Sequence, residues 1–142
     1  MTPRRNLSKL FVMSKRIEEY ACRKSLEIAL AMNGKNDPRR KHHYAFIWNG
    51  STLISMAKNT NSRNKLMNLW DYPALCTEHA EFGAIRKLNW LDCRKFIMVT
   101  FRLTSTGLLA NGKPCEFCER VIRHVGFKKI YYSDENRQFQ EF

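Results

Sequence analysis

Two short motifs in this sequence combine residue types that can bind a metal ion and move a proton. His79 and Glu81 stand two residues apart in "TEHAEFGAI", where an apolar pattern with helical spacing begins. Cys115 and Cys118 stand in "PCEFC", directly after Pro114, and two thiolates at the start of a helix can reach one metal ion. Each motif alone is common in proteins without such a site, so their combination carries the argument.

The two motifs together supply the ligands of a catalytic zinc centre. His79, Cys115 and Cys118 give three protein ligands, which leaves a fourth coordination position for water. Glu81 is not needed as a ligand, and its spacing from His79 puts its carboxylate beside that position, where it can carry protons. The pattern H-x-E followed by P-C-x-x-C is the signature of zinc-dependent deaminases.

The chain resembles the cytidine and deoxycytidylate deaminase superfamily over about residues 14–133. "HAE" and "PCEFC" match the two motifs of that family in order, and "GFKKIYYS" looks like the strand that follows the second motif. The resemblance implies that His79, Cys115 and Cys118 bind Zn²⁺ and that Glu81 shuttles protons during hydrolytic deamination.

Five residues are expected to contact the substrate: Asn59, Ala80, Trp70, Tyr72 and Arg102. The resemblance implies that Asn59 in "AKNTN" holds the substrate and that the backbone N–H group of Ala80 faces the substrate ring. Trp70 and Tyr72 lie in the long polar segment before the first motif, where they could stack on a base or pack in the core. The sequence leaves open whether Arg102 faces a phosphate or solvent.

Strands and helices alternate along the chain, which predicts an α/β fold. The expected order is a helix at 14–33, a hairpin in "HHYAFIW", "NG" and "STLISMA", a helix at 79–89, a strand at 95–103, a helix at 115–125 and a strand in "KKIYYS". The last two strands each follow a helix and can run parallel. The resemblance implies a three-layer α/β/α sandwich of the cytidine deaminase type, with a mixed sheet of about four to five strands.

The whole chain, 1–142, is expected to form one domain, because this length suffices for a single core. A short basic arm at about 1–13 and a polar tail at about 134–142 flank it, and the tail is too short and polar to add much. An uncovered edge strand before the tail suggests a homo-oligomer or cover by the tail. The sequence shows no membrane span and no secretion signal, so a cytoplasmic protein is expected.

The remaining cysteines and histidines are interpreted as structural or surface residues. The chain has five cysteines, and this odd number favours metal binding or burial over disulfides. Cys22 and Cys93 are expected to be buried or inert. His42 and His43 precede a predicted strand and are expected on the surface.

The charge of the chain favours a polyanionic or phosphorylated partner. Lys and Arg number 25 against 13 Asp and Glu, a net charge of +12. With Lys58, Arg63 and Lys65 in or beside the long segment, this favours conversion of cytosine to uracil in single-stranded DNA or RNA. The alternative substrate is a free cytidine or deoxycytidine nucleotide such as deoxycytidylate, because the basic residues form no concentrated stripe. Adenine or guanine stays open, since these bases share the zinc chemistry.

A third interpretation comes from a different class, a nucleic-acid-binding zinc module without catalysis. Cys76-x-x-His79 with Cys115-x-x-Cys118 would form a closed four-ligand cluster, which is typical of structural zinc. Glu81 would then be an acidic residue at the start of a helix, without a catalytic role. The number of protein ligands separates this interpretation from the catalytic one.

Overall fold

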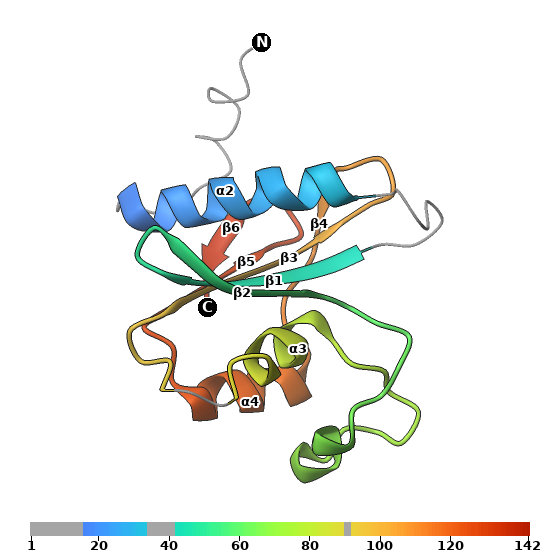
Figure 1. Cartoon of the computed structure of the whole chain (residues 1–142). Coiled ribbons are helices and arrows are strands. Elements are labelled where there is room, and N and C mark those ends of the chain that lie inside the picture. The colour runs from blue at the N-terminus through green and yellow to red at the C-terminus, as the bar shows by residue number, and fades with distance from the viewer. Residues whose placement is uncertain (1–15, 34–41, 90–91) are drawn as a thin grey trace.

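The computed structural model describes residues 16–33, 42–89 and 92–142 and shows an α/β fold built on one mixed sheet (Figure 1). The elements are α2 (Arg16–Met32), β1 (His42–Asn49), β2 (Thr52–Lys58), the 3₁₀ helix η1 (Lys65–Trp70), α3 (Ala80–Arg86), β3 (Ile97–Leu103), β4 (Leu109–Ala110), α4 (Glu116–Val125), β5 (Lys129–Ser133) and β6 (Phe139–Glu141). The α/β class is confirmed, whereas the predicted arm at 1–13 lies outside the described residues. No helix within the described ranges is long and apolar enough to cross a membrane.

The sheet has the strand order β2–β1–β3–β5–β6, and β4 pairs with the end of β3. β1 and β2 form the predicted antiparallel hairpin, whose turn places Gly50 at a φ of 59°. β1 also pairs antiparallel with β3. β3 pairs with β5, and these two strands run parallel as predicted. β1 and β3 are therefore the central strands, which explains their almost continuous burial.

Helices cover both faces of the sheet, with α2 on one face and α3 and α4 on the other (Figure 1). Side chains of β1 alternate between the two faces, as the pleat of a strand requires. Tyr44, Phe46 and Trp48 pack in the core under α2, whereas Ala45 and Ile47 pack in the core under α3 and α4. Odd-numbered residues of β1 consequently face the two helices that carry the metal-binding motifs.

The prediction that the tail at 134–142 adds little to the fold is wrong. β6 pairs antiparallel with β5, and Phe139 is fully buried with its ring edge-on to Phe101. β4 and β6 together bring the sheet to six strands instead of the predicted four to five. The tail thus covers the open edge of β5, which confirms the second of the two alternatives predicted for that edge, a homo-oligomer or cover by the tail.

The predicted surface position of His42 and His43 is also wrong, because both side chains are buried. β1 begins at His42, so the two residues belong to a central strand and not to the loop before it. Cys22 and Cys93 are buried as predicted, and all five cysteines are free thiols.

Replacing Phe139 by alanine should lower the free energy of unfolding by about 3–5 kcal/mol, because the change removes a buried aromatic ring and leaves a cavity. Glu135→Ala, an exposed change in the same tail, should stay within about 0.5 kcal/mol of the parent chain. Urea unfolding followed by circular dichroism measures both values. Equal midpoints for the two variants would show that the tail is not part of the core.

Candidate metal centre

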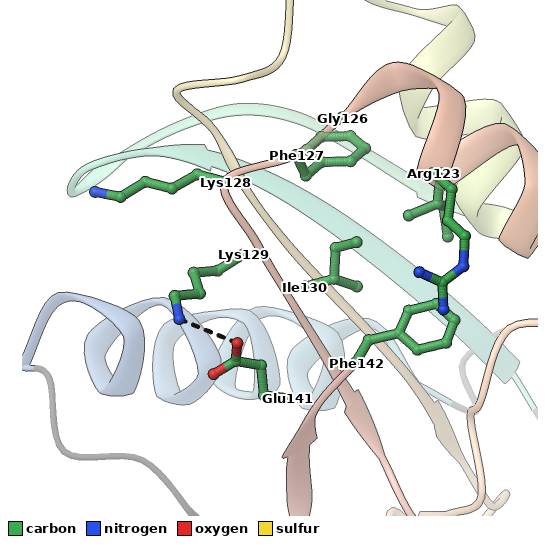
Figure 2. A pocket seen from close by; sticks show the side chains of 9 residues that line it. Arg123, Gly126, Phe127, Lys128, Lys129, Ile130, Glu141 and Phe142 are labelled. Carbon is green, nitrogen blue, oxygen red and sulfur yellow. Dashed lines mark hydrogen bonds and ion pairs between the residues drawn. The ribbon is translucent and has the colours of Figure 1, made fainter.

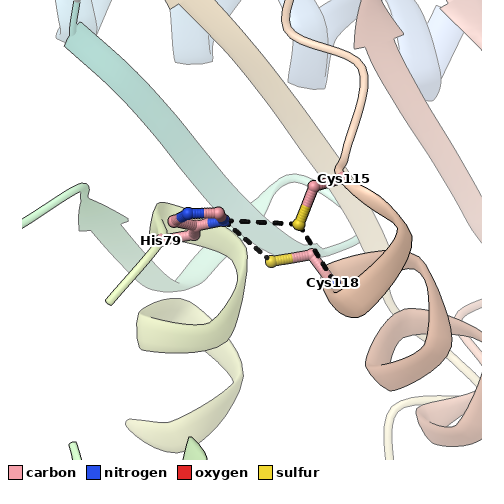
Figure 3. A group of neighbouring side chains, drawn as sticks. All are labelled: His79, Cys115 and Cys118. Carbon is pink, nitrogen blue, oxygen red and sulfur yellow. Dashed lines mark hydrogen bonds between the residues drawn. The ribbon is translucent and has the colours of Figure 1, made fainter. Parts of the chain in front are cut away.

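The two sequence motifs meet where α3 and α4 begin (Figure 3). His79 is the N-cap of α3 and Cys115 is the N-cap of α4. Nδ1 of His79 lies 3.5 Å from Sγ of Cys115 and 3.4 Å from Sγ of Cys118. The three ligand atoms lie within 4.8 Å of one another, so this group could hold one metal ion. The structure thus brings together the three residues that the spacing predicts.

The start of α3 is held in place by Glu78, the residue before His79. The guanidinium group of Arg86 donates hydrogen bonds of 2.8 and 3.0 Å to the buried carboxylate of Glu78. The backbone of Glu78 also accepts from Thr60 N–H and donates to the carbonyl of Ser62. These bonds fix the point from which the His79 ring enters the site.

The start of α4 is held against the sheet at Gly112. Gly112 N–H donates to the carbonyl of Ser133, and a Cβ atom at this position would lie 2.7 Å from the Cα of Phe101. Glycine is therefore required where the chain passes close to β3, three residues before Cys115. The close passage sets the position of the first turn of α4.

The pKa values of the two cysteines of the centre are shifted in opposite directions. Hydrogen bonds from Cys118 and then from His79 lower the pKa of the Cys115 thiol to about 3 against the cost of burial. The Cys115 sulfur and burial raise the pKa of Cys118. The hydrogen bond with Cys115 likewise raises the pKa of His79. The Cys115 thiolate also accepts from Cys118 N–H at the positive end of α4, where a helix favours an anion.

Cys76 approaches the same histidine from the other side of the ring. Its Sγ lies 3.4 Å from Nε2 of His79, whereas Cys115 and Cys118 lie at Nδ1. A metal ion at Nδ1 leaves Nε2 protonated, so Nε2–H can donate to Cys76 and fix the ring orientation. The four-ligand cluster with Cys76 would require a different placement of this side chain.

Glu81 lies on the first turn of α3 and is almost completely buried, with 1% of its surface exposed. Among the buried side chains that the structure describes, only its two carboxylate oxygens lack a hydrogen-bond partner. A buried carboxylate without partners costs free energy, so its retention here needs an explanation. A polar group bound beside it would provide one.

Glu81 and two of the metal-ligating residues, His79 and Cys115, line a cavity of about 210 Å³. His79, Cys115, Thr77 and Lys113 line it together with Glu81, His43, Asn59 and Arg102. Pockets for drug-sized ligands measure about 300–1,000 Å³. The cavity therefore suits one heterocyclic ring, and a larger ligand would extend out of it.

Two of the predicted substrate residues lie in the cavity wall and three do not. Asn59 and Arg102 line the cavity, and Ala80 is buried beside it at the start of α3. Tyr72 packs behind the centre with its hydroxyl 2.9 Å from Sγ of Cys118. Trp70 contacts His124 edge-on at a ring distance of 5.1 Å. The two aromatic side chains of the long segment are thus packed against the protein.

The long segment before the first motif is organised by Arg63. Its guanidinium group donates to the carbonyls of Pro73, Tyr72 and Cys76 and to the side chain of Asn68. Arg63 therefore holds the segment together, and these four bonds engage both of its terminal nitrogens.

The sequence interpretation missed His43 and Lys113, which also line the cavity. Lys113 directly precedes the second motif, so its proximity could have been inferred from its place in the sequence. His43 lies on the same face of β1 as Ala45 and Ile47, so the alternation of strand side chains would have placed it here.

A second cavity, of about 300 Å³, lies at the end of α4 and beside β5 and β6 (Figure 2). Its wall includes the Lys129–Glu141 ion pair, with 3.0 Å between Nζ and Oε2, and the Arg123 guanidinium group 5.0 Å from the Phe142 ring centre. None of the described residues that line it is a histidine or a cysteine. Two of the metal-ligating residues and Glu81 therefore line the smaller of the two cavities.

No protein-family model matches the chain, and a comparison with curated proteins also finds no match. The functional assignment therefore rests on the geometry of the centre and on the motifs.

Metal binding should distinguish Cys118 from Cys76. We expect Cys118→Ser to lose stoichiometric zinc binding, because it removes a ligand. Cys76→Ser should keep one zinc ion per chain with affinity reduced by no more than about 10–100-fold, the range for residues that contact a ligand. Metal analysis after dialysis measures the zinc content, and X-ray absorption spectroscopy counts the sulfur ligands. Two sulfur ligands are expected in the parent chain, from Cys115 and Cys118. A third sulfur ligand would contradict a centre made of His79, Cys115 and Cys118.

Zinc binding should strengthen as the pH rises. The pKa of Cys118 is raised, so at neutral pH its thiol holds a proton that a metal ion must displace, and the pKa of His79 is raised in the same direction. Each proton released increases the apparent affinity about tenfold per pH unit. Titration calorimetry in buffers of different ionisation enthalpy measures the released protons. A pH-independent affinity would show that the ligands are already deprotonated.

Proposed function

We propose that this protein is a zinc-dependent hydrolytic deaminase that converts cytosine to uracil in single-stranded nucleic acid. The observation that carries the proposal is the buried, unpartnered carboxylate of Glu81, which lies beside three metal-ligating side chains in a cavity of the size of one base. The arrangement of α2 opposite α3 and α4 supports the cytidine deaminase layering that the motifs imply.

The donor set of the centre fits zinc. One imidazole nitrogen and two thiol sulfurs are ligands that zinc prefers, and three protein ligands leave a position open. The buried oxygens of Glu81 face the same cavity and need a polar partner. A zinc ion held by His79, Cys115 and Cys118 would supply activated water at neutral pH.

Glu81 moves the protons of the proposed reaction. Water adds to the ring carbon that carries the exocyclic amine, and the Glu81 carboxylate takes one proton from that water. It gives this proton to the ring nitrogen and then assists the transfer of a second proton to the departing amine, so the products are uracil and ammonia. Neither oxygen of Glu81 forms a hydrogen bond, so no hydrogen bond has to break before these transfers.

The cavity wall provides contacts for the rest of the substrate. The side-chain oxygen Oδ1 of Asn59 accepts from His43 N–H at 3.0 Å, which leaves the side-chain N–H₂ group to donate to a ligand. Arg102 and Lys113 line the cavity with two positive charges, which suit the phosphate next to a bound base.

The choice of a polynucleotide substrate rests on the net charge of +12, which exceeds what one phosphate requires. Because Arg63 is engaged within the protein, the support from the long segment is reduced to Lys58 and Lys65. A free nucleotide such as deoxycytidylate is the second candidate, because Arg102 and Lys113 together could neutralise a single phosphate.

Glu81→Gln should reduce turnover by about 10²–10⁴-fold, because it removes the proton carrier while keeping the shape of the side chain. Zinc content should remain one ion per chain, since Glu81 is not a ligand. Initial rates with zinc-loaded protein and metal analysis of the same samples give both values. Turnover close to that of the parent chain would refute the mechanism.

The substrate is tested by a parallel deamination assay with zinc-loaded protein. One arm contains a single-stranded DNA oligonucleotide with one cytosine, and the other contains cytidine, deoxycytidine and deoxycytidylate, with Glu81→Gln as the blank. We expect uracil in the oligonucleotide, and binding that weakens steeply with salt. Conversion of the free compounds alone would identify a nucleotide deaminase, and no conversion in either arm would contradict cytosine deamination.

A further inference from the structure

His43 is a buried histidine in the cavity wall that the proposed proton transfers do not use. It lies near the start of β1 on the face covered by α3 and α4, and its side chain is 11% exposed. Its Nε2 lies 3.6 Å from Oε2 of Glu81, the carboxylate that has no hydrogen bond. A buried polar ring beside a buried unpartnered carboxylate suggests that the two groups act together.

The position of the His43 ring is fixed by neighbours on both adjacent strands. Its backbone N–H and carbonyl form two hydrogen bonds with Asn59, of 3.0 and 3.1 Å. Nε2 lies 2.8 Å from Oγ1 of Thr100 on β3, and the Thr100 hydroxyl lies 3.2 Å from the Tyr44 carbonyl. The ring therefore has little freedom to turn.

The Thr100 contacts define which ring nitrogen carries the proton. The hydroxyl has one hydrogen, and the carbonyl of Tyr44 can only accept, so both contacts are hydrogen bonds only if Nε2–H of His43 donates to Thr100. Burial lowers the pKa of His43, which favours the neutral ring at neutral pH. The neutral ring then presents its N–H edge to Thr100 and Glu81 and its Nδ1 lone pair elsewhere.

We infer that His43 is a positioning residue for Glu81, and this inference rests on the proposed deaminase function. The Nε2–H dipole, held by Thr100, attracts Oε2 of Glu81 and favours one rotamer of the carboxylate. In that rotamer the second oxygen is free to exchange protons with water and substrate. Without His43 the carboxylate adopts several orientations, and only a fraction of these can transfer a proton to water or substrate.

Turnover tests this role through His43→Leu and His43→Gln. We expect His43→Leu to lower kcat at least tenfold, with KM changed less than threefold and zinc content unchanged. His43→Gln keeps an N–H donor at similar reach and should recover most of kcat, which a role in packing alone would not predict. His42→Leu is the matched control, because His42 is a buried histidine that precedes it on the same strand and faces away from the cavity. Equal kcat values for the parent chain and both His43 variants would overturn the inference.

A double-mutant cycle tests the contact without turnover. The urea midpoints of the full chain are compared for His43→Leu, Glu81→Gln, the double variant and the parent. We expect His43→Leu to lower the midpoint less when Glu81→Gln is present, because the carboxylate charge that the Nε2–H dipole attracts is gone. Additive shifts would overturn the inference even if the parent chain deaminates cytosine. Coupled shifts in a chain that deaminates nothing would support the contact while refuting the proposed function.

Discussion

The structure depends on the meeting of two helix starts at one histidine nitrogen. Nδ1 of His79 lies within 3.5 Å of both sulfurs of the second motif, although the motifs belong to different helices. This approach requires α3 and α4 to pack side by side on one face of the sheet. The core that these helices share with the sheet includes small side chains, among them Ala45 on β1 and Ala84 on α3. The hydrogen bonds of Glu78 fix the position of the start of α3, and the close passage of the chain at Gly112 fixes that of α4.

The polar groups of the site lie on one face of the sheet, and the core on the opposite face, under α2, stabilises the strands that carry them. The same central strands that carry His43 and Thr100 toward α3 and α4 carry Tyr44 and Phe101 toward α2. An unpaired buried polar group costs about 1–3 kcal/mol, and more when it is charged. The stacked aromatic rings of the opposite face, with Phe46 and Phe101 centred 5.8 Å apart, offset this cost. The aromatic packing on one face of the sheet thus offsets the cost of the unpaired buried carboxylate on the other face.

The sequence predicts what is local and misses what depends on strand pairing. The hairpin could be predicted because the two-residue turn at Asn49-Gly50 determines it, and the metal group because each of its two motifs has a short, recognisable spacing. The role of Phe139 could not, because a polar tail gives no sign that one ring enters the core. The burial of His43 was missed because His42 and His43 were placed before the strand, whereas β1 begins at His42. The structural role of Arg63 depends on carbonyl groups that composition does not reveal.

The contact between His79 and Cys115 spans 36 residues of chain, and β3 lies inside that span. An ion held at both ends would act as a cross-link that closes a loop around the central strand. Closing a loop of this length removes chain entropy worth about 4 kcal/mol from the unfolded state. The ion would therefore serve the folding of the sheet as well as its chemistry, and the order of events during folding would depend on when the metal arrives.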